Sequence, residues 1–130
     1  MGQDSNNKSP QQTFLVLLRA EGASIAVVVT LLFAVVSRDW WLFALLFFVP
    51  DISMIGYLAG PRIGALSYNV FHTYLTPTVI AIVGFLGGAP IVTEISMIWF
   101  AHIGFDRALG YGLKQSSGFK DTHLSKPQTI

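Results

Sequence analysis

The sequence predicts an all-α integral membrane protein, a four-helix bundle whose helices run up, down, up and down. Three observations support this fold class. Hydrophobic residues make up 52% of the 130 residues, and the mean hydropathy is +0.57. Charged residues make up only 12%, against about 25% in an average soluble domain. Finally, apolar segments of roughly 20 residues, the length that crosses a hydrocarbon core about 30 Å thick, recur along the chain between short breaks.

The first two segments are residues 14–36 and 41–60, separated by the charged and aromatic corner SRDWW. Two tryptophans in this corner are typical of the aromatic belt at a membrane surface. Pro50 and Asp51 interrupt the second segment. A proline inside a helix removes one backbone hydrogen bond and kinks the helix. If one segment is re-entrant and does not cross the membrane, we expect it to be this one.

The third segment is residues 63–86, and it follows the Gly60-Pro61 break. The fourth segment is residues 91–109, and Pro90 before it is expected at the first position of a helix. Because the connections are short, neighbouring helices should be antiparallel. The sequence thus predicts a four-span helical domain over residues 13–113, with a disordered N-terminal tail at 1–12 and a polar cytoplasmic C-terminal tail at 114–130.

Lysine and arginine placement predicts the orientation, because these residues are enriched on the cytoplasmic side of membrane proteins. With four spans, both termini share one side with the Gly60-Pro61 break. That side collects Lys8, Arg62, Lys114, Lys120 and Lys126, whereas Arg38 lies on the other. We therefore expect both termini in the cytoplasm and a multi-pass protein of the bacterial inner (plasma) membrane.

Composition also excludes several classes of function. The net charge is +1 and the sequence has no basic cluster with interleaved aromatic residues, so no nucleic-acid partner is expected. The chain has no cysteine, which excludes disulfides, thiolate metal sites and thiol nucleophiles. Any metal ligands must therefore be histidine, aspartate or glutamate.

Ionisable residues inside the apolar segments are the strongest indication of a functional site, because each costs several kcal/mol in hydrocarbon unless it is paired or bound to a metal. If each helical residue adds about 1.5 Å, their distances from the cytoplasmic ends of the segments place them in one layer, which extends from the middle of the bilayer into its cytoplasmic half. These residues are Glu21, Asp51, His72, His102 and Asp106. Glu21 has a simpler alternative, an interfacial pair with Arg19.

Two of the predicted helices carry polar residues at helical spacing. His102 and Asp106 are four residues apart, so they share one helix face and suit a common ion. On the third segment Asn69, His72, Thr73 and Thr76 form a stripe that should face the bundle interior. We therefore predict Asp51, His72, His102 and Asp106 as metal ligands. A GxxxG pair at Gly56 and Gly60 suits close helix packing, including packing between copies of the chain.

Two long blocks resemble a known family. They are PDISMIGYLAGPRIGALSYNVFHTYLTP at 50–77 and WFAHIGFDRALGYGLKQSSGFKDTHL at 99–124. Both resemble the small bacterial membrane proteins of domain-of-unknown-function family 4260, and the resemblance covers essentially all of the chain after the N-terminal tail. It implies a small multi-span bacterial membrane protein without an established activity. By this resemblance the family's polar signature falls on Glu21, Asp51, Tyr57, Arg62, Asn69, His72, Tyr74, His102, Asp106, Arg107, Lys114, Lys120, Asp121 and His123.

A looser similarity connects the chain with membrane-bound metal-dependent hydrolases of bacteria. Those proteins show an acidic residue after a proline, a histidine on one helix and an H-x-x-x-D on a later helix. The runs PD at 50–51, FHT at 71–73 and HIGFD at 102–106 follow this order. The match is incomplete, because Phe71 stands where that family has a basic residue.

The first functional hypothesis is a metal-dependent hydrolase that acts on a lipid-like substrate at the cytoplasmic leaflet. Zinc or a similar divalent ion would activate water between the four ligands. Glu21 or Asp121 would serve as general base. Arg62, Arg107 and Asn69 would bind the substrate, with the arginines holding an anionic head group.

Two alternatives remain open from the sequence. His72 and His102 would suit the axial positions of a haem in an electron carrier, although that leaves the two aspartates without a role. The chain also fits a non-catalytic accessory subunit, a small transporter or an ion-conducting oligomer. In these cases the same residues would form a proton or ion relay, or a structural hydrogen-bond network. The expected partners are membrane lipid and either further copies of the chain or the other subunits of a membrane complex.

Overall fold

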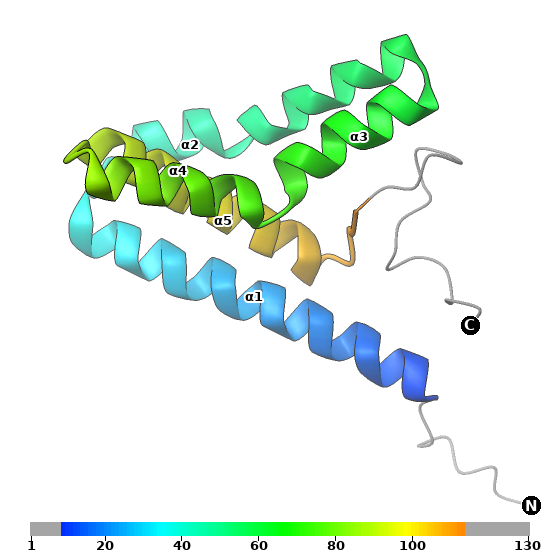
Figure 1. Cartoon of the computed structure of the whole chain (residues 1–130). Helices are drawn as coiled ribbons and strands as arrows, with labels where there is room; N and C mark the ends of the chain where they lie inside the picture. Colours follow the sequence, from blue (N-terminus) through cyan, green and yellow to red (C-terminus); the bar gives the residue numbers. More distant parts are fainter. Residues whose placement is uncertain (1–8, 114–130) are drawn as a thin grey trace, which may run out of the picture.

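Residues 9–113 are described by a computed structural model, and all regular structure within them is helical (Figure 1). This confirms the all-α class. The elements are α1 (Pro10–Val36), α2 (Trp40–Phe47), the 3₁₀ helix η1 (Val49–Ala59), α3 (Pro61–His72), α4 (Leu75–Leu86) and α5 (Pro90–Ala108). Pro90 occupies the first turn of α5, as predicted. The start of α1 at Pro10, where Ser9 and Gln12 form a capping box, makes residues 10–12 helical and corrects their assignment to a disordered tail.

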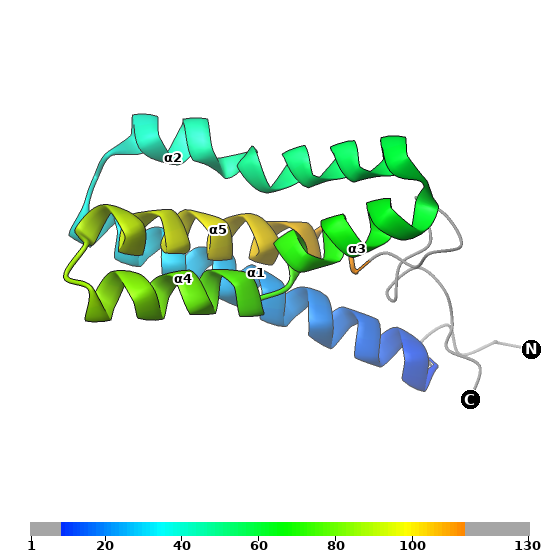
Figure 2. The same ribbon diagram turned by 45° about the horizontal axis from the view of Figure 1, so that its top comes forward.

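The chain reverses direction at each of its main turns. In Figure 1 the loops at 37–39 and 87–89 lie at one end of the molecule, whereas the Gly60-Pro61 turn, the start of α1 and the end of α5 lie at the other. Figure 2 shows α5 between its neighbours, with α2 on one side and α1 and α4 on the other. α5 is therefore the central helix of the described residues.

α1 and α5 cross at two glycines that let their backbones touch. A Cβ added at Gly104 would lie 2.6 Å from the Gly22 carbonyl oxygen, and one at Gly22 would lie 2.8 Å from the Gly104 carbonyl oxygen. Close to this crossing, Arg19 Nε donates to the Ala108 carbonyl oxygen at 2.9 Å. Arg19 thus binds the C-terminal end of α5, where the helix dipole favours a cation. Glu21 is not its hydrogen-bond partner.

Two helical stretches are long and apolar enough to cross a membrane, namely Pro10–Val36 and Trp40–Ala59. α3 and α4 meet at an angle of 45°, and together they give a third stretch of this kind if they form one broken span. α5, expected as a fourth, does not pass this test, because it carries Glu94, Asp106 and Arg107. The described residues are thus compatible with membrane association through two or three apolar stretches.

The third segment is broken, whereas the sequence predicted one continuous helix. α3 ends at His72, Thr73 is extended with φ −97° and ψ 146°, and α4 begins at Leu75. Pro77 explains the break, because a proline lacks a backbone N–H and is tolerated only in the first turn of a helix. Asn69 and Thr76 consequently lie on different helices, and the polar stripe predicted along one face does not exist.

η1 and α3 form a hairpin, and α2 ends before Pro50, so the interruption expected there is confirmed. The hairpin turns at Gly60, whose φ of 117° favours glycine. A Cβ at Gly56 would lie 2.8 Å from Ser67 Cβ, and Ser67 Oγ donates to the Ser53 carbonyl oxygen at 2.9 Å. Gly56 therefore packs within the chain, against α3, and is not left open as part of a GxxxG face.

Candidate metal centre

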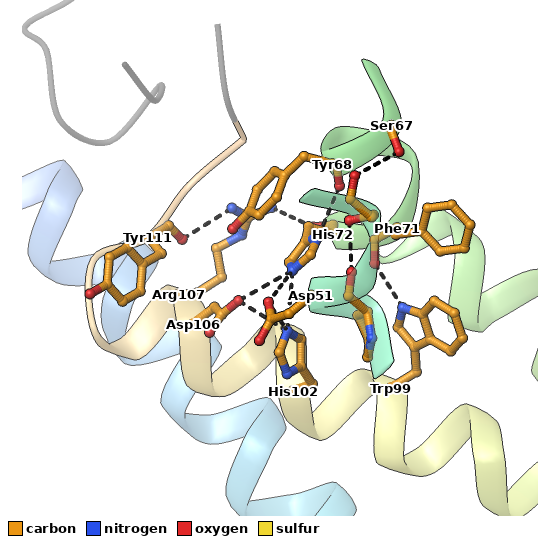
Figure 3. A network of polar contacts seen from close by, with 12 residues as sticks. Asp51, Ser67, Tyr68, Phe71, His72, Trp99, His102, Asp106, Arg107 and Tyr111 are labelled. Carbon is orange, nitrogen blue, oxygen red and sulfur yellow. Dashed lines mark hydrogen bonds and ion pairs between the residues drawn. The ribbon is translucent and has the colours of Figure 1, made fainter. Parts of the chain in front are cut away.

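Four predicted ligands from three elements converge on one point (Figure 3). Asp51 lies in the first turn of η1, His72 is the last residue of α3, and His102 and Asp106 lie one turn apart on α5. One nitrogen or oxygen atom from each lies within 4.8 Å of the corresponding atoms of the other three. The η1–α3 hairpin thus provides one half of the cluster and α5 the other.

The individual separations are short and similar. His102 Nε2 lies 3.2 Å from His72 Nε2, 3.3 Å from Asp51 Oδ1 and 3.2 Å from Asp106 Oδ2. His72 Nε2 lies 3.2 Å from Asp51 Oδ1 and 3.6 Å from Asp106 Oδ2. Zinc holds nitrogen and oxygen ligands at about 2.0–2.2 Å, which sets tetrahedral ligand atoms roughly 3.3–3.6 Å apart. The five separations that involve a histidine nitrogen therefore match those of a tetrahedral ligand set, and all four ligand atoms lie within 4.8 Å of one another.

His72 is oriented by Tyr68, one turn earlier on α3. The two rings are stacked, with centroids 3.7 Å apart and planes 7° from parallel. His72 Nδ1 lies 2.9 Å from the Tyr68 carbonyl oxygen, which can only accept, so Nδ1 carries the proton of this hydrogen bond. In neutral His72 the Nε2 lone pair therefore points into the cluster. A histidine that donates from one ring nitrogen to a carbonyl and binds with the other is the usual arrangement of a metal ligand.

His102 is held by packing. Its ring contacts the Phe47 ring edge-on, with centroids 5.1 Å apart, and the His72 ring at 5.2 Å. His102 Nδ1 is buried and has no hydrogen-bond partner among residues 9–113. The two histidines thus differ, because only His72 has a second partner that fixes its protonated nitrogen.

Side chains from α4 and α5 satisfy the carbonyl groups that the broken helix leaves free. Thr76 Oγ1 donates to the Val70 carbonyl oxygen. Trp99 Nε1 donates to the Phe71 carbonyl oxygen at 2.7 Å, and Arg107 Nη2 donates to that of His72 at 3.1 Å. Buried carbonyl groups that lose their partner within a helix require such replacement partners. The break that positions His72 is therefore held against α5 in two ways, by hydrogen bonds from α5 side chains to its backbone carbonyl groups and by the side-chain cluster.

The cluster is buried on one side and accessible on the other. The side chains of both histidines are 2% exposed, that of Asp106 is 17% exposed and that of Asp51 is 36% exposed. Asp51 thus marks the open side. Two neutral imidazoles and two carboxylates would neutralise a divalent ion, and imidazole and carboxylate are ligands that zinc accepts. The residues present therefore fit such an ion.

The other predicted site residues are dispersed. Glu21 is exposed on α1 and forms no hydrogen bond or ion pair with the cluster in the described part of the chain. Arg62 lies at the start of α3, ten residues and thus about 15 Å from His72. Asn69 lies on α3 one turn before His72, and Asp121 lies outside the described residues. Arg107, one of the predicted substrate-binding residues, contacts a predicted ligand, because it donates to the His72 carbonyl oxygen.

Sequence reasoning missed two residues of the site. Tyr68 could have been identified, because its spacing of four residues before His72 places it on the same face of α3. Trp99 carries no local signal of its role. Its bond to the Phe71 carbonyl oxygen depends on a helix break that only Pro77 signals in the sequence.

Fold and site together define a class, a small all-helical protein with membrane-length apolar helices around a buried cluster of two histidines and two aspartates. A family model described as "Domain of unknown function (DUF4260)" matches residues 15–126. The match covers most of the chain, so the protein belongs to this family, as the resemblance indicated. Comparison with curated proteins and with solved structures finds no match, so the looser similarity to membrane-bound hydrolases gains no support.

Proposed function

We propose that this protein is an integral membrane metal-dependent hydrolase that binds one divalent ion, preferably zinc, and acts on a lipid-like substrate at the cytoplasmic leaflet. The ion would lie between Asp51, His72, His102 and Asp106. One observation carries the proposal: the two histidine Nε2 atoms lie 3.2 Å apart and 3.2–3.6 Å from a carboxylate oxygen of each aspartate, in a largely apolar helical interior.

The free-energy cost of bringing these four side chains together without a cation supports the proposal. With the His72 proton on Nδ1, its Nε2 is an acceptor that faces two carboxylates and a second imidazole. A proton on His102 Nε2 can satisfy only part of this set of acceptors. The acceptors that remain repel each other, and unpaired charge in an apolar interior costs free energy. A divalent cation converts this repulsion into coordination and neutralises both aspartates.

The exposed side of the cluster is where hydrolysis would take place. A zinc ion with four protein ligands can bind a water molecule when its coordination expands to five. Asp51 is the most exposed ligand, so water and substrate would reach the ion beside it. The ion would lower the pKa of the bound water and polarise the substrate. The chain's own contribution is to hold the ligands and to keep water away from the buried side.

The proposed location follows from the ends of the molecule. We place four spans in the inner membrane: α1, α2 with η1, α3 with α4, and α5. α5 packs against α1, α2 and α4, so its polar residues are shielded from lipid. The end with Arg62 and both chain termini would be cytoplasmic, and the end with Arg38 would face outwards.

Haem fits the cluster less well than a small ion. Two imidazoles on opposite faces of one iron, each about 2.0 Å from the metal, would have their nitrogens about 4 Å apart with the macrocycle between them. His72 Nε2 and His102 Nε2 are 3.2 Å apart. Both also contact the two carboxylates, which occupy the space that a macrocycle would need.

Elemental analysis of detergent-purified protein, together with its visible absorption spectrum, tests the proposal. We expect about one equivalent of zinc and no haem absorption. His102→Ala should lose the ion, whereas Glu94→Gln, eight residues away on the same helix, should retain it. A preparation without stoichiometric metal, or a His102→Ala variant that keeps it, would refute the metal centre. If the ion is present but zinc-loaded protein hydrolyses no phospholipid ester, the accessory-subunit or transporter alternative replaces the hydrolase.

A further inference from the structure

The hydroxyl end of Tyr68 and the guanidinium of Arg107 lie next to each other at the edge of the metal cluster (Figure 3). We infer that these two groups form a subsite for a phosphoryl group that binds at the same time to the metal ion. This inference rests on the proposed metal centre and names the class of substrate that the centre would accept.

Arg107 is held in place by its neighbours but keeps donors for a ligand. Its Nη1 donates to the Tyr111 carbonyl oxygen at 3.2 Å and its Nη2 to the His72 carbonyl oxygen at 3.1 Å. A guanidinium has five N–H donors, and these are its hydrogen bonds within residues 9–113. Both bonds go to neutral carbonyls, so no carboxylate neutralises the cation through them. The group is thus fixed beside the cluster with its charge available.

Tyr68 places a hydroxyl at the same edge. The residue is buried at 3% exposure, and its ring is held parallel to that of His72. Asp106, Asp51 and Arg107 are the charged groups close enough to act electrostatically on this hydroxyl. A phenol that lies between a metal ligand and an arginine is well placed to donate a hydrogen bond to an oxygen of a bound anion.

The charge balance makes anion binding dependent on the metal. The carboxylates of Asp51 and Asp106 neutralise a divalent ion, so Arg107 leaves the loaded site with one positive charge in excess. Without the ion the same groups carry one negative charge in excess if His102 is neutral and no net charge if it is protonated, so in both cases an anion binds more weakly than to the loaded site. A phosphoryl group has several oxygens in tetrahedral arrangement, so one can bind the metal while others accept from Arg107 and Tyr68. Both a lipid phosphate and free phosphate supply this group.

Calorimetric titration of the zinc-loaded full chain in a non-ionic detergent with inorganic phosphate tests the inference. We expect saturable binding to zinc-loaded protein and none after zinc removal. Tyr68→Phe keeps the ring stacked on His72, so it should retain the zinc but weaken phosphate binding roughly tenfold, the size expected for one hydrogen bond to a charged group. Arg107→Lys keeps the positive charge but loses the planar set of N–H donors, so it should weaken phosphate binding by a similar factor.

Tyr111→Phe is the matched control, because it removes a hydroxyl that points away from the cluster while its backbone carbonyl still binds Arg107 (Figure 3). It should bind phosphate like the original protein. A second arm compares mixed micelles that contain phosphatidic acid with micelles that contain diacylglycerol of the same chains. Tighter binding of phosphatidic acid than of inorganic phosphate supports a lipid source, and binding of inorganic phosphate alone supports a free anion.

The results separate this inference from the proposed function. Zinc-loaded protein that binds no phosphate, or a Tyr68→Phe variant that binds it as well as the original chain, would overturn the subsite and leave the metal centre intact. Protein that holds no zinc would overturn both. The zinc content of each variant, measured on the same sample, shows which case applies.

Discussion

The two halves of the candidate metal cluster are built in different ways. On α5, His102 and Asp106 stand one turn apart on an uninterrupted helix, and helix geometry alone puts them on one face. On the η1–α3 hairpin, Asp51 lies in the first turn of a 3₁₀ helix and His72 at the last residue of α3. Both hairpin ligands depend on places where regular structure stops. The α5 half is thus set by local geometry, and the hairpin half by tertiary contacts.

Local geometry sets the spacing of the two residues on α5, but the position of α5 itself depends on its crossing with α1, and the largest expected effect comes from disturbing that crossing. In Gly104→Val the new Cβ would meet the Gly22 backbone oxygen at 2.6 Å and the Ala26 nitrogen at 2.8 Å, and neither backbone atom can give way easily. We expect a loss of about 3 kcal/mol in unfolding free energy, the upper range for overpacking. Thermal unfolding in detergent measures it. Ala44→Val, at an exposed position on α2, should unfold like the original chain; equal stability of the two variants would contradict the tight crossing.

The second prediction compares one ligand from each half. Asp106 is less exposed than Asp51, 17% against 36%, so water competes less with its bond to the ion. Asp106→Asn should lower zinc affinity on the order of 100-fold and Asp51→Asn about tenfold, the range seen when groups that support a metal are removed. Competition with a zinc chelator measures both. The reverse order would show that the hairpin half dominates binding.

The third prediction loosens the hairpin half without touching a ligand. Trp99→Phe keeps an aromatic ring against Phe71 but removes the donor to the Phe71 carbonyl oxygen. We expect a loss of about 1 kcal/mol in unfolding free energy and a several-fold weaker zinc affinity. Trp41→Phe, at a residue that is 81% exposed, is the control. If both variants behave alike, the bond does not support the break.

The smallest effect is expected within the hairpin itself. Ser67→Ala removes the bond to the Ser53 carbonyl oxygen that joins α3 to η1, and hydrogen bonds between membrane helices contribute about 0.6 kcal/mol on average. A shift of this size in thermal unfolding is expected, with zinc content unchanged. Ser24→Ala, which removes a bond within α1, should have no larger effect. A loss of zinc in Ser67→Ala would mean that the hairpin pairing sets the position of Asp51 more strictly than we infer.

The same contrast explains how much the sequence could predict. The sequence could predict that His102 and Asp106 lie on one face, because both belong to one regular helix. The depth of His72 in an apolar segment identifies it as a site residue. Its position at the end of a helix was not predicted, because the predicted third helix continued through Thr73 and Pro77 was not expected to break it. The sequence also placed Arg62 at the site, although about 15 Å of α3 separates it from His72. Contacts such as those of Tyr68 and Trp99 depend on how helices pack, and no local pattern encodes that.

The bend between α3 and α4 has a consequence for how this family can vary. Pro77 accounts for the break, but Thr76, Trp99 and Arg107 now hold the carbonyl groups of Val70, Phe71 and His72 in its place. A chain that lost the proline would still have these three anchors, and straightening the helix would require all of them to be given up. The proline is therefore replaceable once the anchors exist. Members of the family without it should keep the same bend.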